Sequence, residues 1–370
     1  MTTGVCVVGA AESDLGVTGK TALHLQTQAV TRALADAGLR LADVDGLATN
    51  GVSRFSATQV AEHLGLRPRW TDSTFAGGAA FELYVGHAVQ AIQAGQASVV
   101  VISYGSNQRS ARSRTFDPYE AHTPEAQFEQ PYGPLYPVSA YALAAQLYLH
   151  TYGADRGRAG MTSVAVAARE WAQQNPRAYR YGAGPLDAAE MDASPLVSDP
   201  LRVADCCLVT DGGGAVVLTT VDRARDLPAV PVEVLGYGEA TTGTSIVGVG
   251  DLLRTGAVDS GRRAFAMAGL TPADVDSAQI YDSFTITVLL TLEALGFCGF
   301  GEAPDLVAAG TLPMNTSGGG LSYCHPGQLG VLLLVEAVRR LRGTADRVAL
   351  AHGTGGILST HGTVLLGRTS

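Results

Sequence analysis

A chain of 370 residues, 46% of them hydrophobic, is long enough to bury a large core in two domains or in one large one. Its formal net charge of −9 and its lack of a basic stripe argue against nucleic acid as a partner. The longest apolar runs carry a Glu and fall short of the ~20 apolar residues that cross a bilayer, so we expect no membrane span.

The chain opens on an apolar stretch with no basic region before it, which predicts a strand rather than a signal peptide. Its five cysteines are an odd number and contain no CxxC pair. We therefore expect neither a disulfide framework nor a metal site in this chain, and a reducing, cytoplasmic location.

Apolar β-branched runs then alternate with helical patterns. In chain order, strands are predicted at 5–11, 98–105, 214–220, 230–238, 277–284, 347–353 and 361–368, and helices at 21–38, 81–95, 139–153, 161–176 and 329–343. Strands that are apolar along their whole length belong in sheets covered on both faces. The sequence therefore predicts an α/β fold.

A repeat is visible in this order. Residues 37–45 read AGLRLADVD and residues 268–276 read AGLTPADVD, and each follows an amphipathic helix and precedes a strand. A looser pair, Gly77-Gly78 and Gly319-Gly320, precedes a helix and a strand in each half. We therefore predict two similar α/β halves, residues 1–220 and 221–370.

One segment has no clear periodicity. Residues 109–137 are rich in Pro, Tyr and charge. Long irregular segments in compact domains are usually lids or binding loops, so we place a lid region at about 109–200 within the first half.

The stretch NTSGGGLSYCHPGQLG, residues 315–330, concentrates chemically useful residues: three glycines are followed by Tyr323, Cys324 and His325. Together with VVGAAESDLG, DPLRVADCCLVTDGGGAVVLT, YDSFT and AHGTGG, in this order, it resembles the thiolase superfamily along most of the chain. The resemblance is closest to the sterol carrier protein X and lipid-transfer-protein thiolases. It implies the thiolase fold, a five-layered αβαβα sandwich of two pseudo-repeated halves.

The chain departs from the thiolases at their nucleophile. Phe75, in DSTFAGGAAFEL, stands at or beside the position of the nucleophilic cysteine. The second cysteine of the family is also missing, because the C-terminal element reads HGTGG from His352 to Gly356. Chemistry through an acyl-enzyme therefore looks unavailable.

The steroid side-chain-cleaving aldolases share these losses, and the chain resembles them. The resemblance implies a retro-aldol cleavage of a β-hydroxyacyl-CoA, with Tyr281 and Tyr323 handling protons. His325 is retained from the thiolase pattern. The reaction needs a base, an acid and a site for the enolate oxygen.

Each candidate residue has a structural alternative. Tyr323 and Tyr281 also suit plain packing, and Asp282 suits helix capping better than a supporting role in the site. We expect His325, at a helix start, to be neutral and to donate to the thioester oxygen. The amides of Gly355 and Gly356 are further candidate donors, unless they form a plain turn. His352 is expected near the site.

Two rival functions stay open. The first is thiolytic or Claisen chemistry, as in a β-ketoacyl-CoA thiolase or acyltransferase, using Cys324, although a buried filler is the commoner role for such a cysteine. The second is a non-catalytic lipid-carrier subunit. Arg109, Arg112 and Arg114 are candidates for contacts with the CoA phosphates, or belong to a solvated loop.

The resemblance also implies partners. We expect a homodimer, and a small zinc-ribbon/OB-fold partner protein that completes a heterotetramer and carries the only zinc. No covalently bound cofactor is expected, and the substrate is a CoA thioester with a bulky, steroid-like acyl group.

Overall fold

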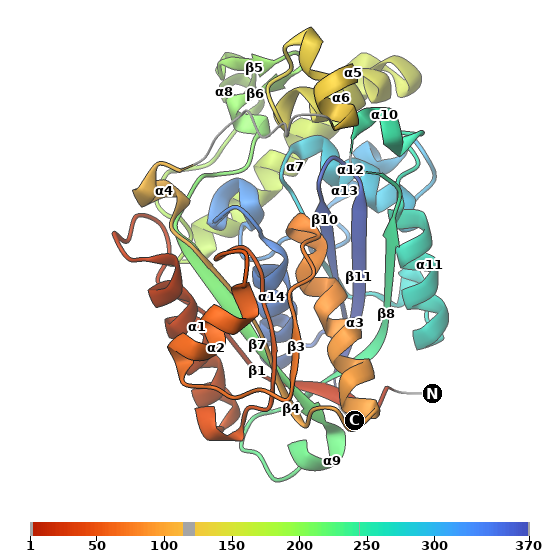
Figure 1. Cartoon of the computed structure of the whole chain (residues 1–370). Coiled ribbons are helices and arrows are strands. Elements are labelled where there is room, and N and C mark those ends of the chain that lie inside the picture. Colours follow the sequence, from red (N-terminus) through yellow and green to blue (C-terminus); the bar gives the residue numbers. More distant parts are fainter. Residues whose placement is uncertain (1–2, 114–122, 244, 369–370) are drawn as a thin grey trace.

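The computed structural model describes residues 3–113, 123–243 and 245–368 (Figure 1). Part of the predicted lid, residues 114–122 with Arg114, lies outside this description. No helix within it is long and apolar enough to cross a membrane.

The described strands of the main sheet run in the order β3-β2-β4-β7-β1-β8-β11-β10-β9. The first five are β1 (Val5–Glu12), β2 (Gly46–Ala48), β3 (Trp70–Asp72), β4 (Val99–Ser106) and β7 (Gly212–Thr220). The others are β8 (Val232–Thr241), β9 (Ser277–Ile280), β10 (Val348–Gly355) and β11 (Thr360–Arg368). The order β2-β4-β7-β1 mirrors the order β8-β11-β10-β9, and the two sets meet where β1 pairs antiparallel with β8.

Alternate residues of these strands enter different cores. In β1, Val5 and Val7 belong to a central cluster with helices α3 (Ala80–Gln93) and α14 (Gly330–Gly343), whereas Cys6 and Val8 face α1 (Ala22–Ala37) and α2 (Ser56–Leu64). This is the two-residue period of a strand buried on both faces.

The second set of strands repeats the pattern. Ala349 and Ala351 of β10 enter the central cluster, and Leu350 faces the outer helices α11 (Ala257–Ala268) and α12 (Thr285–Ala294). Helices α3 and α14 therefore form a middle layer between two sheets that are covered by helices outside (Figure 1). The predicted five-layered αβαβα thiolase fold is confirmed.

The sequence repeat has a structural explanation. Helices α1 and α11 both end at a left-handed glycine, Gly38 (φ 71°) and Gly269 (φ 67°), and a 3₁₀ turn follows each. Asp45 then accepts hydrogen bonds from the amides of Ser98 and Val99 at the start of β4. Its counterpart Asp276 accepts from the amides of residues 347 and 348 at the start of β10. The repeated aspartate joins neighbouring parallel strands in each half.

The remaining elements lie outside these layers, most of them at one end of the sheet. They are α4 (Gln108–Ala111), α5 (Pro124–Phe128), α6 (Val138–Tyr152), α7 (Ala154–Gln174), α8 (Ala188–Ala193), β5 (Leu196–Ser198), β6 (Leu201–Arg202), α9 (Val221–Ala224), α10 (Ile246–Val249) and α13 (Ala303–Ala309). Figure 1 shows α5, α6, α8 and α10 gathered at this end, with α9 at the opposite end. The region expected as a lid is thus largely helical, and the predicted strand 277–284 ends at Ile280.

Candidate active site

The site begins where two parallel strands end. Strands β9 and β10 are neighbours, and Tyr281 follows β9 directly, its amide donating to the carbonyl of His352 over 2.9 Å. Strand β10 runs on to Gly355, and the chain turns at Gly356 with a φ of 61°. Ligands of α/β folds bind at the carboxyl ends of strands, and here those ends bring Tyr281 beside a glycine turn.

The start of α3 packs against this edge through glycine. A Cβ atom on Gly78 would overlap the Tyr281 ring, and one on Gly77 would lie 3.0 Å from the Gly356 amide nitrogen. The backbone therefore approaches Tyr281 and the glycine turn so closely that no side chain, and hence no nucleophile, fits at position 78.

The glycine-rich loop approaches from the other side. Gly318 (φ 106°) and Gly319 (φ 59°) turn the chain into a single π-helical turn, residues 319–323, of the kind often found at functional sites. The expected helix start at His325 is wrong, because α14 begins five residues later, at Gly330. The starts of α3 and α14 both reach this edge, and helix N-termini favour negative charge.

Tyr281 and His325 are brought into direct contact. Tyr281 Oη lies 3.0 Å from His325 Nε2, and the two rings meet edge to face with centroids 5.6 Å apart. Both side chains are 5% exposed. Burial raises the pKa of Tyr281 well above its ordinary value, although a hydrogen bond from the Leu329 backbone opposes the shift. The free site therefore holds a neutral phenol.

Asp282 shapes the loop that carries His325. Its carboxylate oxygens accept from the amides of Gly320 (2.6 Å) and Leu321 (3.2 Å). Burial raises the pKa of Asp282 to about 6, although these amides lower it. The expectation that Asp282 caps α12 is wrong, because Phe284 occupies the N-cap and makes no side-chain cap bond.

Tyr323 is placed differently from Tyr281. It is 2% exposed, and its hydroxyl has no hydrogen-bond partner among the described residues, so it is not bonded to Tyr281 or His325. Burial raises the pKa of Tyr323 well above its ordinary value, and the nearby charge of Glu12 adds to the shift. Tyr323 is thus a second neutral phenol, with an uncommitted hydroxyl.

The structure offers no activated cysteine. The Sγ atom of Cys324 lies 3.1 Å from Thr210 Oγ1, and burial raises the pKa of this thiol to about 12. All five cysteines of the chain lie within the described ranges, and none of them forms a disulfide bond there. Phe75 is 72% exposed and is followed by Ala76 and Gly77, which carry no nucleophile.

His352 lies behind the glycine turn and is fully buried. Its Nδ1 is 2.9 Å from Thr363 Oγ1, and its Nε2 is 3.2 Å from Nδ1 of His361. Sequence reasoning missed His361, to which it assigned no role. The β10–β11 pairing places Thr354 opposite His361 and His352 opposite Thr363, so the hairpin register is the signal that would have found it.

Glu82 was also missed. It lies one helical turn after Gly78, is 1% exposed, and neither carboxyl oxygen has a hydrogen-bond partner among the described residues. Its carboxyl group lies against the backbone of Gly330 and Gly353. Burial raises the pKa of Glu82 well above its ordinary value, so this side chain is a neutral acid. A lone Glu in the apolar run AFELYV was the available signal.

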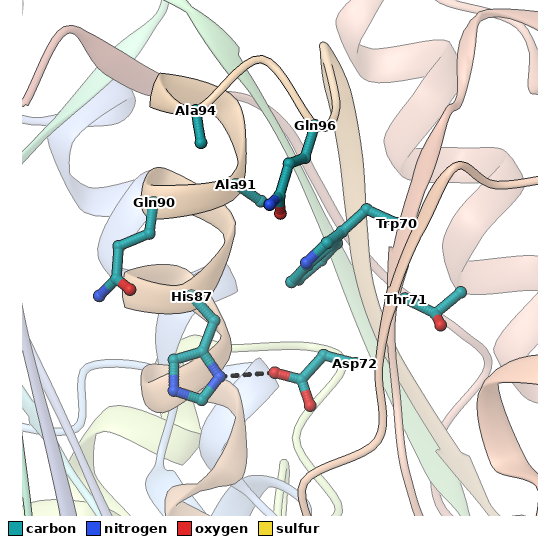
Figure 2. A pocket seen from close by; sticks show the side chains of 8 residues that line it. All are labelled: Trp70, Thr71, Asp72, His87, Gln90, Ala91, Ala94 and Gln96. Carbon is teal, nitrogen blue, oxygen red and sulfur yellow. Dashed lines mark hydrogen bonds and ion pairs between the residues drawn. The ribbon is translucent and has the colours of Figure 1, made fainter.

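A surface cavity of about 400 Å³ lies elsewhere, between α3 and the edge strand β3 (Figure 2). Its lining residues are Trp70, Thr71, Asp72, His87, Gln90, Ala91, Ala94 and Gln96. Figure 2 shows His87 on α3 facing Asp72 on β3, at 2.5 Å, and the other ring nitrogen of His87 lies 3.3 Å from Glu239. None of the residues predicted from the sequence lines this cavity.

Comparison with known proteins agrees with this arrangement. A family described as "Thiolase C-terminal domain-like" matches residues 238–368. A Mycobacterium tuberculosis protein named 17-hydroxy-3-oxo-4-pregnene-20-carboxyl-CoA lyase is 36% identical, over 97% of this chain and 98% of its own length. A steroid side-chain-cleaving aldolase from Thermomonospora curvata is 35% identical, over 97% of this chain and 96% of its own length.

A solved structure, "Ltp2-ChsH2(DUF35) aldolase", superposes with a TM-score of 0.88 at 31% identity, covering 99% of this chain and 98% of that one. These similarities extend over nearly the whole chain. The chain therefore belongs to the thiolase superfamily, alongside the steroid side-chain-cleaving aldolases.

Proposed function

We propose that the protein is a carbon–carbon lyase that cleaves a β-hydroxyacyl-CoA by a retro-aldol reaction, without an acyl-enzyme. The observation that carries this proposal is the Tyr281–His325 pair, packed against a glycine at position 78 that leaves no room for a nucleophile. A proton-transfer pair suits bond cleavage by acid–base chemistry, whereas thiolysis needs a thiolate.

The pair supplies the base. Tyr281 donates its phenol proton to His325 Nε2 as it accepts the proton of the substrate β-hydroxyl. The hydrogen bond from the Leu329 backbone steadies the negative charge that develops on the phenol oxygen during this exchange. A tyrosine whose pKa is raised works here only because His325 takes its proton in the same step.

Tyr323 supplies the acid. Loss of the hydroxyl proton breaks the bond between the α and β carbons and gives a ketone and the enolate of the shortened acyl-CoA. A neutral phenol with an uncommitted hydroxyl is suited to donate a proton to the enolate α carbon. The protons balance over a turnover, because His325 releases to solvent the proton taken from the hydroxyl and Tyr323 regains one from solvent.

The enolate oxygen is stabilised by the backbone. The turn at Gly355 and Gly356 lies against Gly77, where α3 begins, and amides at such positions donate to an oxyanion. The positive ends of α3 and α14 add a favourable field at this edge. His352 is a supporting residue, because its side chain faces away from the turn into the hairpin.

The substrate class follows from the relatives. The Mycobacterium tuberculosis protein carries a name that specifies a hydroxylated, pregnene-based carboxyl-CoA and a lyase. We propose a CoA thioester with a bulky, steroid-like acyl group for this chain, entering beneath the helices that cap the sheets. Zinc enters only through a partner, and no covalent cofactor takes part.

Partners are proposed on two grounds. The solved relative is named for two components, an aldolase and ChsH2(DUF35), and we propose a comparable assembly with a small zinc-ribbon/OB-fold protein.

We also propose a homodimer, supported by the uncovered edge strand β3 and by Phe55 and Phe75 beside it, each 72% exposed. Light scattering on the chain alone and with its partner measures both. We further propose a cytoplasmic location, which suits five cysteines that form no disulfide bond in the described structure.

The testing experiment incubates the native assembly with a panel of β-hydroxyacyl- and β-ketoacyl-CoA thioesters and identifies products by mass spectrometry. We expect a ketone and a shortened acyl-CoA from a β-hydroxyacyl substrate, with no acyl adduct on the chain. A stable adduct would instead identify a thiolase or acyltransferase, and binding without turnover in the presence of the partner would identify a lipid carrier.

A further inference from the structure

We infer that Ser260, Thr363, His352 and His361 form a hydrogen-bond chain with one fixed direction, which ends on the carbonyl of Leu358 and holds the glycine turn in place. The two histidines are therefore positioning residues for the donors of the turn. The catalytic part of this inference rests on the proposed function, whereas the existence and direction of the hydrogen-bond chain do not.

The four side chains are continuous and fully buried. Ser260 Oγ, on α11, lies 2.9 Å from Thr363 Oγ1, which lies 2.9 Å from His352 Nδ1. His352 Nε2 lies 3.2 Å from His361 Nδ1, and His361 Nε2 lies 3.1 Å from the Leu358 carbonyl oxygen. All four residues are 0% exposed. The chain thus crosses from the outer helix layer through β11 and β10 to the turn.

Its direction follows from the last acceptor. A carbonyl oxygen only accepts, so His361 Nε2 carries a proton and donates to Leu358. In a neutral ring Nδ1 then accepts, so His352 Nε2 donates to it. With His352 neutral, its Nδ1 accepts from the Thr363 hydroxyl. Ser260 Oγ then donates to Thr363 at 2.9 Å in preference to the Ala257 carbonyl at 3.3 Å.

Both imidazoles must be neutral for this arrangement. A charged histidine carries protons on both nitrogens. On His361 this would place two N–H groups face to face between the rings, and on His352 it would turn Nδ1 into a donor to Thr363 and reverse that end of the hydrogen-bond chain. Burial agrees with the geometry: it lowers the pKa of His361 to about 4 and the pKa of His352 well below its ordinary value.

The hydrogen-bond chain ends on a residue with a strained backbone. Leu358 has a φ of 53°, a left-handed conformation that a bulky side chain rarely adopts. On the opposite side, the Tyr141 hydroxyl donates to the Gly356 carbonyl over 3.0 Å. The turn is therefore held from the sheet by His361 and from the capping helices by Tyr141.

Two substitutions separate the two ends of the His361 ring. His361→Gln keeps an N–H near the Nε2 position and preserves donation to Leu358, whereas His361→Asn keeps an acceptor near Nδ1 and loses that donation. Each variant loses one buried hydrogen bond, so their melting temperatures should fall by similar amounts. The two variants should differ only in whether the side chain at position 361 still donates to the Leu358 carbonyl and so keeps the glycine turn in place.

We expect His361→Asn to lower kcat about 100-fold with little change in KM, the effect of an ~1 Å misplacement of catalytic donors, and His361→Gln to stay within a few-fold of wild type. Hydrogen exchange of amides 355–359 in the native assembly should accelerate in the Asn variant and not in the Gln variant. Nitrogen-15 NMR of the wild type should show both histidines protonated on Nε2 only.

Equal exchange and equal kcat in the two variants would overturn the positioning role. A proton on Nδ1 of either histidine would overturn the direction of the chain. If the wild type cleaved no β-hydroxyacyl-CoA, the proposed function would fail. The exchange and NMR measurements would still test whether the hydrogen-bond chain holds the turn and which direction it has.

Discussion

Tyr281 and His325 are 44 residues apart in sequence, yet the phenol oxygen of one lies 3.0 Å from the Nε2 atom of the other. One follows strand β9, and the other leaves the glycine loop that precedes α14. Because both groups are buried, a proton exchanged between them is shielded from water.

The first prediction concerns the removal of each side chain that is proposed to transfer a proton. Tyr281→Phe removes the group that receives the hydroxyl proton, so cleavage should fall ~10²–10⁴-fold, and His325→Ala should fall by a similar factor. Tyr323→Phe should also slow cleavage, because the enolate is no longer protonated. Steady-state kinetics with a β-hydroxyacyl-CoA measures all three, and thermal unfolding checks that each variant is folded.

A partial reaction tests which tyrosine is the acid. Exchange of the α hydrogen of the product acyl-CoA in D₂O needs a group that removes and returns the proton at the α carbon, but no base for a hydroxyl. We expect Tyr281→Phe to retain this exchange and Tyr323→Phe to lose it. The opposite pattern would reverse the two roles.

The second prediction concerns the close approach at Gly78. Gly78→Ala places a methyl group inside the Tyr281 ring, so Tyr281 must move and turnover should fall at least 100-fold. Gly343→Ala, at the end of α14, meets nothing within 4 Å and serves as the control. Full activity of Gly78→Ala would mean that Tyr281 works from a different position.

The third prediction tests the rival cysteine mechanism. Cys324 is a buried thiol that is hydrogen-bonded to Thr210. Cys324→Ala should therefore lower the stability of the fold somewhat and leave kcat within a few-fold of wild type. Abolished turnover in this variant, with both tyrosine variants still active, would replace the aldolase reading by a cysteine mechanism.

Much of the fold was predictable because its long strands and helices bury apolar residues with clear periods. The repeated AGL-x-x-ADVD segments were informative for a physical reason, since Asp45 and Asp276 bind the starts of neighbouring strands. Strands β2 and β3 were missed because three residues are too few to show a period.

The site was predictable only in part. Local motifs identified Tyr281 and His325, but their contact depends on packing between α3, α14 and the strand ends. The role of Asp282 was misjudged because its partners, Gly320 and Leu321, are far away in sequence. His361 carries no local signal, since only the β10–β11 register brings it to His352.

The last prediction concerns Glu82, whose carboxyl group is buried without a hydrogen-bond partner in the described structure. Burial raises its pKa in the folded state. As the pH rises above the ordinary pKa of a glutamate, the unfolded chain therefore loses this proton first. Within the window between the two pKa values the free energy of unfolding should fall by ~1.4 kcal/mol per pH unit.

Glu82→Gln, a neutral group of the same shape, lacks this loss. Urea unfolding should show the variant close to wild type near pH 4.5 and progressively more stable than wild type as the pH rises. Glu62→Gln, on the exposed face of α2, serves as the control for the substitution itself. A difference between Glu82→Gln and wild type that does not change with pH would mean that the carboxyl group is ionised and solvated in the folded protein.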